Sequence, residues 1–160
     1  MTFVGMSEIR YVRKPEKMKT MGLGSCVGVV VYHQSSGIAG MAHIMLPDSA
    51  LSRVRPFSPG KYADTAVPEL IHVLSDLHGL PLNGLKAKMA GGAEMFKSFS
   101  NAQAGSIGKR NVDAVHRQLN QFGIPVVAED TGDSYGRTIE FDPESGTLMI
   151  QTILHGKLLI

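Results

Sequence analysis

The sequence predicts an α+β fold, a single-domain α/β sandwich in which a mixed, largely antiparallel sheet packs against two main helices. Three observations indicate this class. Strand-like apolar runs occur as hairpins near both ends of the chain, apolar residues recur at helical spacing between them, and no repeat or linker divides the chain. At 160 residues the chain is long enough for one domain, residues 1–160, to bury a core without disulfide bonds.

The first predicted element is a β-hairpin. Residues 27–32 and 38–45 are apolar runs of strand length, and residues 34–37 between them have the composition of a turn. The two runs are therefore expected to pair as antiparallel neighbours.

The register of this hairpin decides which side chains lie together. A turn centred on residues 35 and 36 places Gly28 opposite His43 and Cys26 opposite Met45. Because side chains alternate across a strand, these four residues and Met41 then share one face. His43 lies diagonal to Cys26, at roughly 7–8 Å between backbones, a separation that long side chains can bridge. We expect Gly28 to leave room for the imidazole; a turn one residue longer or shorter would move His43 to the other face.

Two amphipathic helices are predicted after the hairpin. Residues 61–78 carry apolar side chains at helical spacing, between start and stop signals. Pro68 fits this helix only in its first turn, so we expect the helix to begin after Lys61. Residues 111–122 form the second helix, which Gly123 ends.

The remaining strands follow these helices along the chain. Residues 85–90 and 124–129 are each predicted to be a strand. The runs 138–141 and 147–153 flank a segment of turn composition, residues 142–146, and therefore predict a closing hairpin.

Composition excludes several classes of protein. The net charge is only +2, there is no Trp, and the basic residues are scattered, which argues against nucleic-acid binding. One cysteine excludes an internal disulfide framework and a multi-cysteine zinc site, and the six histidines show no metal-ligand spacing, so we expect neither a metal nor a cofactor. No apolar run approaches the roughly 20 residues of a membrane helix, and no leader pattern opens the chain. We expect a cytoplasmic protein without membrane insertion.

Two other glycine-containing segments do not support a nucleotide-binding interpretation. Residues 105–110 resemble half of a phosphate-binding loop, but Gln103 and Arg110 occupy positions that require Gly and Ser or Thr. Gly91 and Gly92 follow a strand without completing a dinucleotide-binding pattern, so we expect a tight turn or a close backbone approach there.

Cys26 is the strongest candidate for chemistry. It ends the glycine-rich segment 20–25, and a thiol nucleophile needs a base within reach, which His43 can supply. The backbone N–H groups of that segment, with Gly24 and Ser25 as the candidates, could hold a thiolate or a developing oxyanion. The alternative is that Cys26 is a small core hydrophobe and His43 a satisfied histidine at the end of a strand.

The chain closely resembles the chemoreceptor glutamine deamidase family, CheD, in several motifs that occur in order. They are TMGLGSCVGVVVY and GMAHIMLP in residues 20–47, KYAD at 61–64, KMAGGA at 88–93 followed by MF, IG at 107–108 followed by RN, and GR at 136–137. Residues 130–133 depart from the family, which often has a second glycine after the first.

This resemblance implies a Cys-His-Thr triad, which maps onto Cys26, His43 and Thr20. It also implies a catalytic fold similar to that of deamidating toxins of the cytotoxic necrotizing factor type. The reaction implied is thiol-dependent conversion of glutamines in the cytoplasmic domain of methyl-accepting chemoreceptors to glutamate with release of ammonia. Thr20 would orient the imidazole through its hydroxyl or its carbonyl, and a CheC-type phosphatase of the response regulator is the implied partner.

Two other functions remain open on the residues alone. A non-catalytic module could bind receptors and modulate kinase output together with the phosphatase, and it would retain its effect after Cys26→Ala. A thiol redox sensor is the third possibility, although the chain holds no second cysteine to resolve an oxidised thiol.

Overall fold

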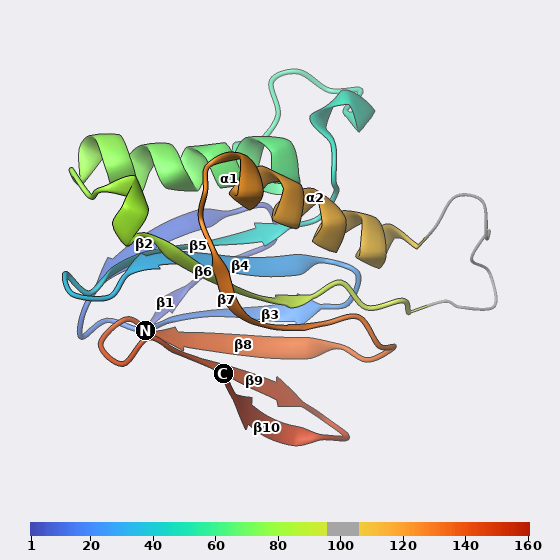
Figure 1. Ribbon diagram of the computed structural model, residues 1–160. Coiled ribbons are helices and arrows are strands. Elements are labelled where there is room, and N and C mark those ends of the chain that lie inside the picture. Colours follow the sequence, from blue (N-terminus) through green and yellow to red (C-terminus); the bar gives the residue numbers. More distant parts are fainter. Residues whose placement is uncertain (96–105) are drawn as a thin grey trace.

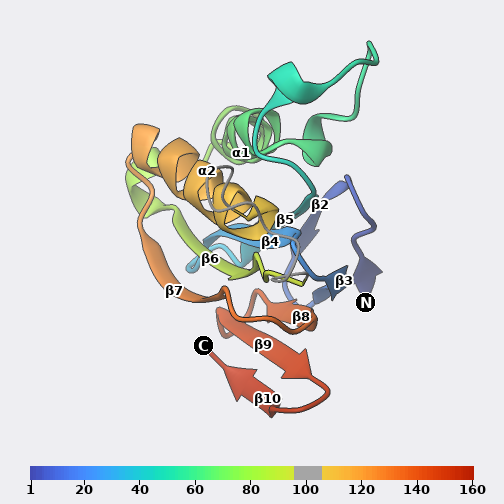
Figure 2. The same cartoon turned by 90° about the vertical axis from the view of Figure 1, so that its right-hand side faces the viewer.

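The protein has three layers in the computed structural model, which describes residues 1–95 and 106–160. Two helices cover one face of a central sheet, and a second, outer sheet packs against its opposite face (Figure 1). Viewed at 90° to this, the helices and the outer sheet lie on opposite sides of the central sheet, with β10 farthest from the helices (Figure 2). The α+β class is confirmed.

Each sheet has five strands. The central sheet, in spatial order, consists of β2 (Ile9–Arg13), β5 (Ile38–Ile44), β4 (Val27–His33), β6 (Lys86–Gly91) and β7 (Val126–Thr131). The outer sheet consists of β1 (Thr2–Phe3), β3 (Met18–Leu23), β8 (Arg137–Asp142), β9 (Thr147–Thr152) and β10 (Gly156–Leu159). Only β1 with β3 and β6 with β7 pair in parallel, so both described sheets are mixed and largely antiparallel.

Both predicted helices are present, with bounds that differ from the predicted ones. Helix α1 (Ala63–His72) starts after Lys61 as expected, but Pro68 lies inside it rather than in its first turn, and the chain continues as a π-helical turn, η3 (Val73–Leu77). Helix α2 (Ile107–Gln121) begins four residues earlier than predicted. Ser106 caps it, because its Oγ accepts a hydrogen bond of 3.1 Å from the Lys109 N–H. Three 3-10 turns complete the helical segments: η1 (Ser49–Leu51), η2 (Pro59–Lys61) and η4 (Leu82–Gly84).

Strand β4 lies at the centre of the molecule, which explains its unbroken apolar sequence. Val27, Val29 and Val31 pack toward the helices, whereas Val30 and Tyr32 pack toward the outer sheet. A strand buried on both faces needs no polar alternation. The central sheet therefore separates two hydrophobic cores.

The hairpin of β4 and β5 has the predicted register, with Gly28 opposite His43. The strands predicted at 85–90, 124–129, 138–141 and 147–153 correspond to β6, β7, β8 and β9, with bounds shifted by one or two residues. Strands β1, β2, β3 and β10 were not predicted. Part of the glycine-rich segment, from Thr20 to Leu23, belongs to β3, where a bulge between these two residues accommodates Gly22 at φ +74°.

The glycine pair after β6 has the predicted backbone geometry. Gly91 and Gly92 both have positive φ, and a Cβ on Gly91 would lie 2.2 Å from the Cys26 carbonyl oxygen, so the expected close backbone approach is confirmed. Residues 103 and 105 of the rejected phosphate-loop pattern, and Phe96 of the family motif, lie outside the described residues.

Candidate active site

The three residues of the implied triad come from different elements. Cys26 immediately precedes β4 and is half-buried, His43 lies on β5 and is completely buried, and Thr20 lies on β3 of the outer sheet with 1% of its surface exposed. Cys26 packs against the core between the two sheets, which is the core on the His43 side of the hairpin. The structure thus brings the thiol, the imidazole and the hydroxyl to the space between the sheets.

Thr20 holds the His43 ring in one orientation. Its Oγ1 lies 2.7 Å from His43 Nδ1 and donates a hydrogen bond of 2.6 Å to the Val4 carbonyl. A hydroxyl has one proton, and the Val4 carbonyl takes it, so Nδ1 must carry the ring proton and donate to Oγ1. In the neutral imidazole this leaves Nε2 unprotonated.

Nε2 of His43 is therefore a nitrogen that can accept a proton. It is buried and has no hydrogen-bond partner among the described residues. Buried polar atoms are rarely left without a partner, and those that are often belong to reactive sites. No hydrogen bond joins Cys26 Sγ to the ring, although both residues are described. The thiol and the imidazole lie on the same side of the hairpin with no hydrogen bond between them.

Gly28 allows the outer sheet to approach His43. A Cβ on Gly28 would lie 2.5 Å from Ile139 Cδ1 and 3.4 Å from Thr20 Cγ2. The space beside Gly28 is thus occupied by side chains of the outer sheet, whereas we had expected it to accommodate the imidazole. Glycine at this position serves the contact between sheets, and through it the contact of Thr20 with His43.

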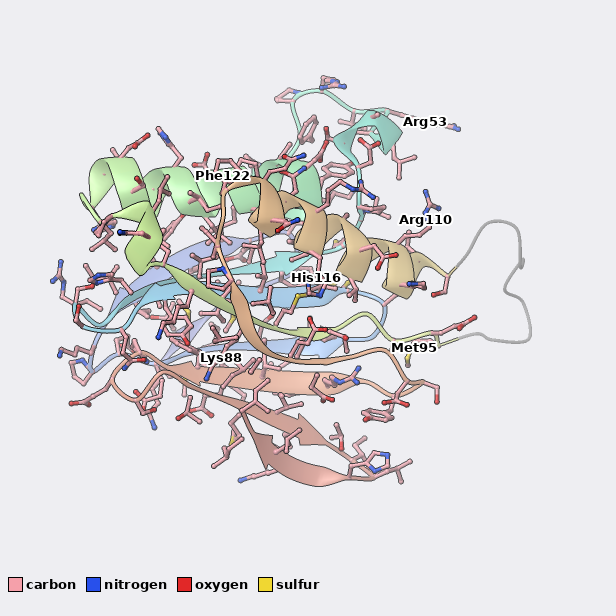
Figure 3. All side chains as sticks on the ribbon, viewed as in Figure 1. Arg53, Lys88, Met95, Arg110, His116 and Phe122 are labelled. Atoms are coloured by element: carbon pink, nitrogen blue, oxygen red, sulfur yellow. The ribbon has the colours of Figure 1, made fainter. Side chains whose placement is uncertain are left out.

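Three consecutive carbonyl groups hold the backbone around Cys26. Those of residues 24, 25 and 26 accept hydrogen bonds from the Ala93 N–H at 2.9 Å, the Asn111 Nδ2 at 2.9 Å and the Gly92 N–H at 2.8 Å. Met95, which follows Gly92 and Ala93 in the chain, packs beside Gly24. A Cβ added to Gly24 would lie 3.3 Å from the Met95 Cγ. In Figure 3, Met95 lies at the end of the molecule where the chain leaves β6. The segment around Cys26 is thus anchored to the residues that follow β6 and to α2.

The N–H groups of this segment differ from one another. That of Gly24 donates to the Gly22 carbonyl at 3.1 Å. Those of Ser25 and Cys26 make no hydrogen bond within the described part of the chain. Gly24 therefore supports the turn, while Ser25 and Cys26 offer two neighbouring donors.

The electrostatic environment favours a neutral thiol and a neutral imidazole. Burial raises the pKa of the Cys26 thiol and lowers the pKa of the His43 imidazole. Both shifts oppose a preformed thiolate–imidazolium pair. A thiol in this environment needs a base to take its proton, and the unprotonated Nε2 is able to accept one.

Asn111 is a site residue that sequence reasoning missed, apart from its place in a family motif. It is completely buried on α2, and its Nδ2 donates to the carbonyls of Ser25 and Met45 at 2.9 and 3.0 Å. A signal existed in the sequence, because Asn111, Val115 and Leu119 recur every four residues on the apolar stripe of the helix. An amide on such a stripe predicts a buried hydrogen-bonding role.

Within residues 1–95 and 106–160, no group of three or more His, Cys, Asp or Glu side chains has the arrangement of a metal site. None of the described helices combines the length and apolarity needed to cross a bilayer.

Comparison with known proteins identifies the family. The family model described as CheD chemotactic sensory transduction matches residues 45–152. The chain is 51% identical over 154 residues to a protein of Halalkalibacterium halodurans named chemoreceptor glutamine deamidase CheD, covering 96% of this chain and 94% of that one. It is 48% identical over 157 residues to the Bacillus subtilis protein of the same name, covering 98% and 94%.

Two solved structures share the fold at low sequence identity. YlmD from Geobacillus stearothermophilus has a TM-score of 0.52 at 10% identity over 78% of this chain and 50% of that one. A Bacillus licheniformis hypothetical protein, YfiH, has a TM-score of 0.51 at 13% identity over 77% and 49%. The match of the family model and the full-length relatives lead to one conclusion: the chain belongs to the CheD family.

Proposed function

We propose that this protein deamidates specific glutamine side chains of chemoreceptors, converting them to glutamate with release of ammonia. One observation carries the proposal: the Val4–Thr20–His43 hydrogen bonds leave an unprotonated Nε2, without a partner among the described residues, on the side of the hairpin that holds the lone cysteine. Relatives about 50% identical over nearly the whole chain are named for this activity, which supports the same conclusion.

The first half-reaction forms a thioester. His43 Nε2 takes the proton of the Cys26 thiol as Sγ attacks the carboxamide carbon of the glutamine. The resulting oxyanion accepts hydrogen bonds from the free N–H groups of Ser25 and Cys26. The protonated imidazole then passes its proton to the departing amine, and ammonia leaves as the thioester forms.

The second half-reaction restores the enzyme. His43 Nε2 takes a proton from a water molecule, which attacks the thioester carbonyl, and the same two N–H groups hold the second oxyanion. Collapse breaks the C–S bond, and the proton on His43 returns to sulfur. Thr20 stabilises the imidazolium in both steps, because its Oγ1 keeps the Nδ1 proton hydrogen-bonded.

The substrate and partner follow from the family. Glutamines on the cytoplasmic helices of methyl-accepting chemoreceptors are the proposed substrates, and a cytoplasmic location is proposed with them. The resemblance stated above supports a CheC-type phosphatase as the regulatory partner.

Mass spectrometry of a chemoreceptor cytoplasmic fragment tests the proposal. The fragment is incubated with the unmodified protein, with Cys26→Ala, with His43→Ala and with His78→Ala, an exposed histidine that serves as the matched control. We expect specific glutamines to change in mass to glutamate when the fragment is incubated with the unmodified protein or with His78→Ala. We expect no change with Cys26→Ala or His43→Ala. If the fragment binds all four proteins equally and no glutamine changes, the protein is a receptor-binding module and the deamidase proposal fails.

A further inference from the structure

The backbone around Cys26 has a geometry that one side chain controls. A trans peptide is planar, so the C=O of one residue and the N–H of the next point in opposite directions. The Gly24 carbonyl points to the Ala93 N–H, and the Ser25 carbonyl points to Asn111 Nδ2. The Ser25 N–H therefore points away from Ala93 and the Cys26 N–H points away from Asn111, which leaves two consecutive donors turned away from the groups that hold the carbonyls.

Asn111 is the only side chain that donates a described hydrogen bond to this segment; the other two donors are backbone N–H groups. The orientation of its amide is determined by its partners, because both neighbours of Nδ2 are carbonyl oxygens, which an amide oxygen would repel. Oδ1 is left buried without a partner among the described residues. An amide kept in this state indicates that its two donors matter to the protein.

The second hydrogen bond of Asn111 links this segment to the strand of the base. Met45 follows β5 directly, two residues after His43, and its carbonyl receives the other Nδ2 proton at 3.0 Å. One amide thus connects the residue before Cys26 to the end of the strand that carries His43. The two strand ends are 20 residues apart in sequence but share this one anchor.

We propose that Asn111 is a positioning residue for the oxyanion hole: by holding the Ser25 carbonyl, it aims the Cys26 N–H at the oxygen of the tetrahedral intermediate. The inference rests on the proposed function, since it assigns a role within the same reaction. It adds a fourth side chain to the three of the triad, one that orients a backbone N–H group. Loss of the Asn111 donors frees the Ser25–Cys26 peptide to rotate, while the Cys26 carbonyl keeps its hydrogen bond from the Gly92 N–H and the imidazole keeps its hydrogen bond to Thr20.

Two reactions of Cys26, deamidation and alkylation, distinguish an effect on the oxyanion donors from an effect on the thiol and the imidazole. Deamidation needs the oxyanion hole, whereas alkylation of Cys26 by iodoacetamide is a displacement that forms no oxyanion. Asn111→Leu keeps the approximate volume of the side chain and removes both donors; Asn120→Leu, on the exposed side of the same helix, is the control. For Asn111→Leu we expect kcat to fall about 10- to 100-fold, below the loss for an entire oxyanion donor, with KM and the alkylation rate within twofold of the unmodified protein.

Two results with this variant overturn the proposal. One is a folded Asn111→Leu protein whose kcat stays within twofold of the control. The other is an alkylation rate that falls in parallel with kcat, which would mean that Asn111 supports the thiol and base rather than the oxyanion donors.

A measurement on the unmodified protein covers the case in which the variant does not fold. A peptide aldehyde that mimics glutamine adds to the thiol, and its oxygen takes the place of the oxyanion. We expect the amide proton of Cys26 to move downfield in the NMR spectrum of the adduct, while that of Gly24, already bonded to Gly22, stays in place. An unmoved Cys26 amide refutes the inference. If the unmodified protein deamidates no receptor glutamine, the proposed function fails separately, and the aldehyde adduct still tests the donor.

Discussion

Replacing Thr20 by Val tests the hydrogen bonds that orient His43. The substitution keeps the shape of the side chain but removes the hydroxyl that donates to the Val4 carbonyl and accepts from Nδ1. Two buried polar groups lose a partner, at about 1–3 kcal/mol each, and the added methyl recovers about 0.8 kcal/mol by burial. We expect the free energy of unfolding to fall by about 1–5 kcal/mol, against the ~5–15 kcal/mol typical of a domain.

The same substitution should slow the reaction. The hydrogen bond from a protonated imidazole to Oγ1 is worth about 1.5–3 kcal/mol, because one partner is charged. At about 1.36 kcal/mol per tenfold change in rate, kcat should fall roughly 10- to 150-fold. Thr20→Ser is the matched control, since it keeps both hydrogen bonds and removes only a methyl group, and its kcat should stay within about threefold of the unmodified protein.

Ammonia release measured at saturating receptor fragment gives kcat for both variants, and urea unfolding gives their stability. A folded Thr20→Val protein with unchanged kcat would refute the reasoning, because the hydroxyl would then not orient the base. Equal losses in Thr20→Ser and Thr20→Val would also refute it, since the methyl group and not the hydroxyl would be responsible.

Three further predictions concern the thiol and two glycines. Burial raises the pKa of the Cys26 thiol, so less thiolate exists at neutral pH. The rate of iodoacetamide alkylation should therefore still rise about tenfold per pH unit at pH 8. A rate that reaches a plateau below pH 8 would contradict this, because it would indicate a preformed thiolate. Gly28→Ala should cost about 1–3 kcal/mol of unfolding free energy by its clash with Ile139, and Ile139→Val, which removes the clashing Cδ1, should recover part of that loss in the double variant; additive losses would contradict this contact. Gly91 has φ +115°, and its added Cβ in Gly91→Ala would lie 2.2 Å from the Cys26 carbonyl oxygen, so this variant should not fold or should have a much lower thermal midpoint. Gly79→Ala is the control, because Gly79 also has positive φ, +67°, but its Cβ would meet open space. Equal shifts of the midpoint in the two variants would show that the close approach is unimportant.

The local part of the site could be predicted from the sequence because it depends on one hairpin. Turn composition at residues 34–37 set the register, and strand alternation placed His43 on the face of Gly28. The outer sheet could not be predicted in the same way. Its strands β1 and β3 are short or interrupted by Gly22, and the pairing of β3 with β8 joins residues more than 100 positions apart.

The sequence by itself determined which residues are the candidates for nucleophile and base. Cys26 is the only thiol, and the two-residue period of β-strands brings His43 to its side. Only the tertiary structure decided how these groups are held. The contact of Thr20 with His43 depends on packing between two sheets, and the contact of Asn111 with Ser25 depends on docking of α2 against the end of β5. Such contacts arise from the close packing of the whole core, which no local pattern encodes.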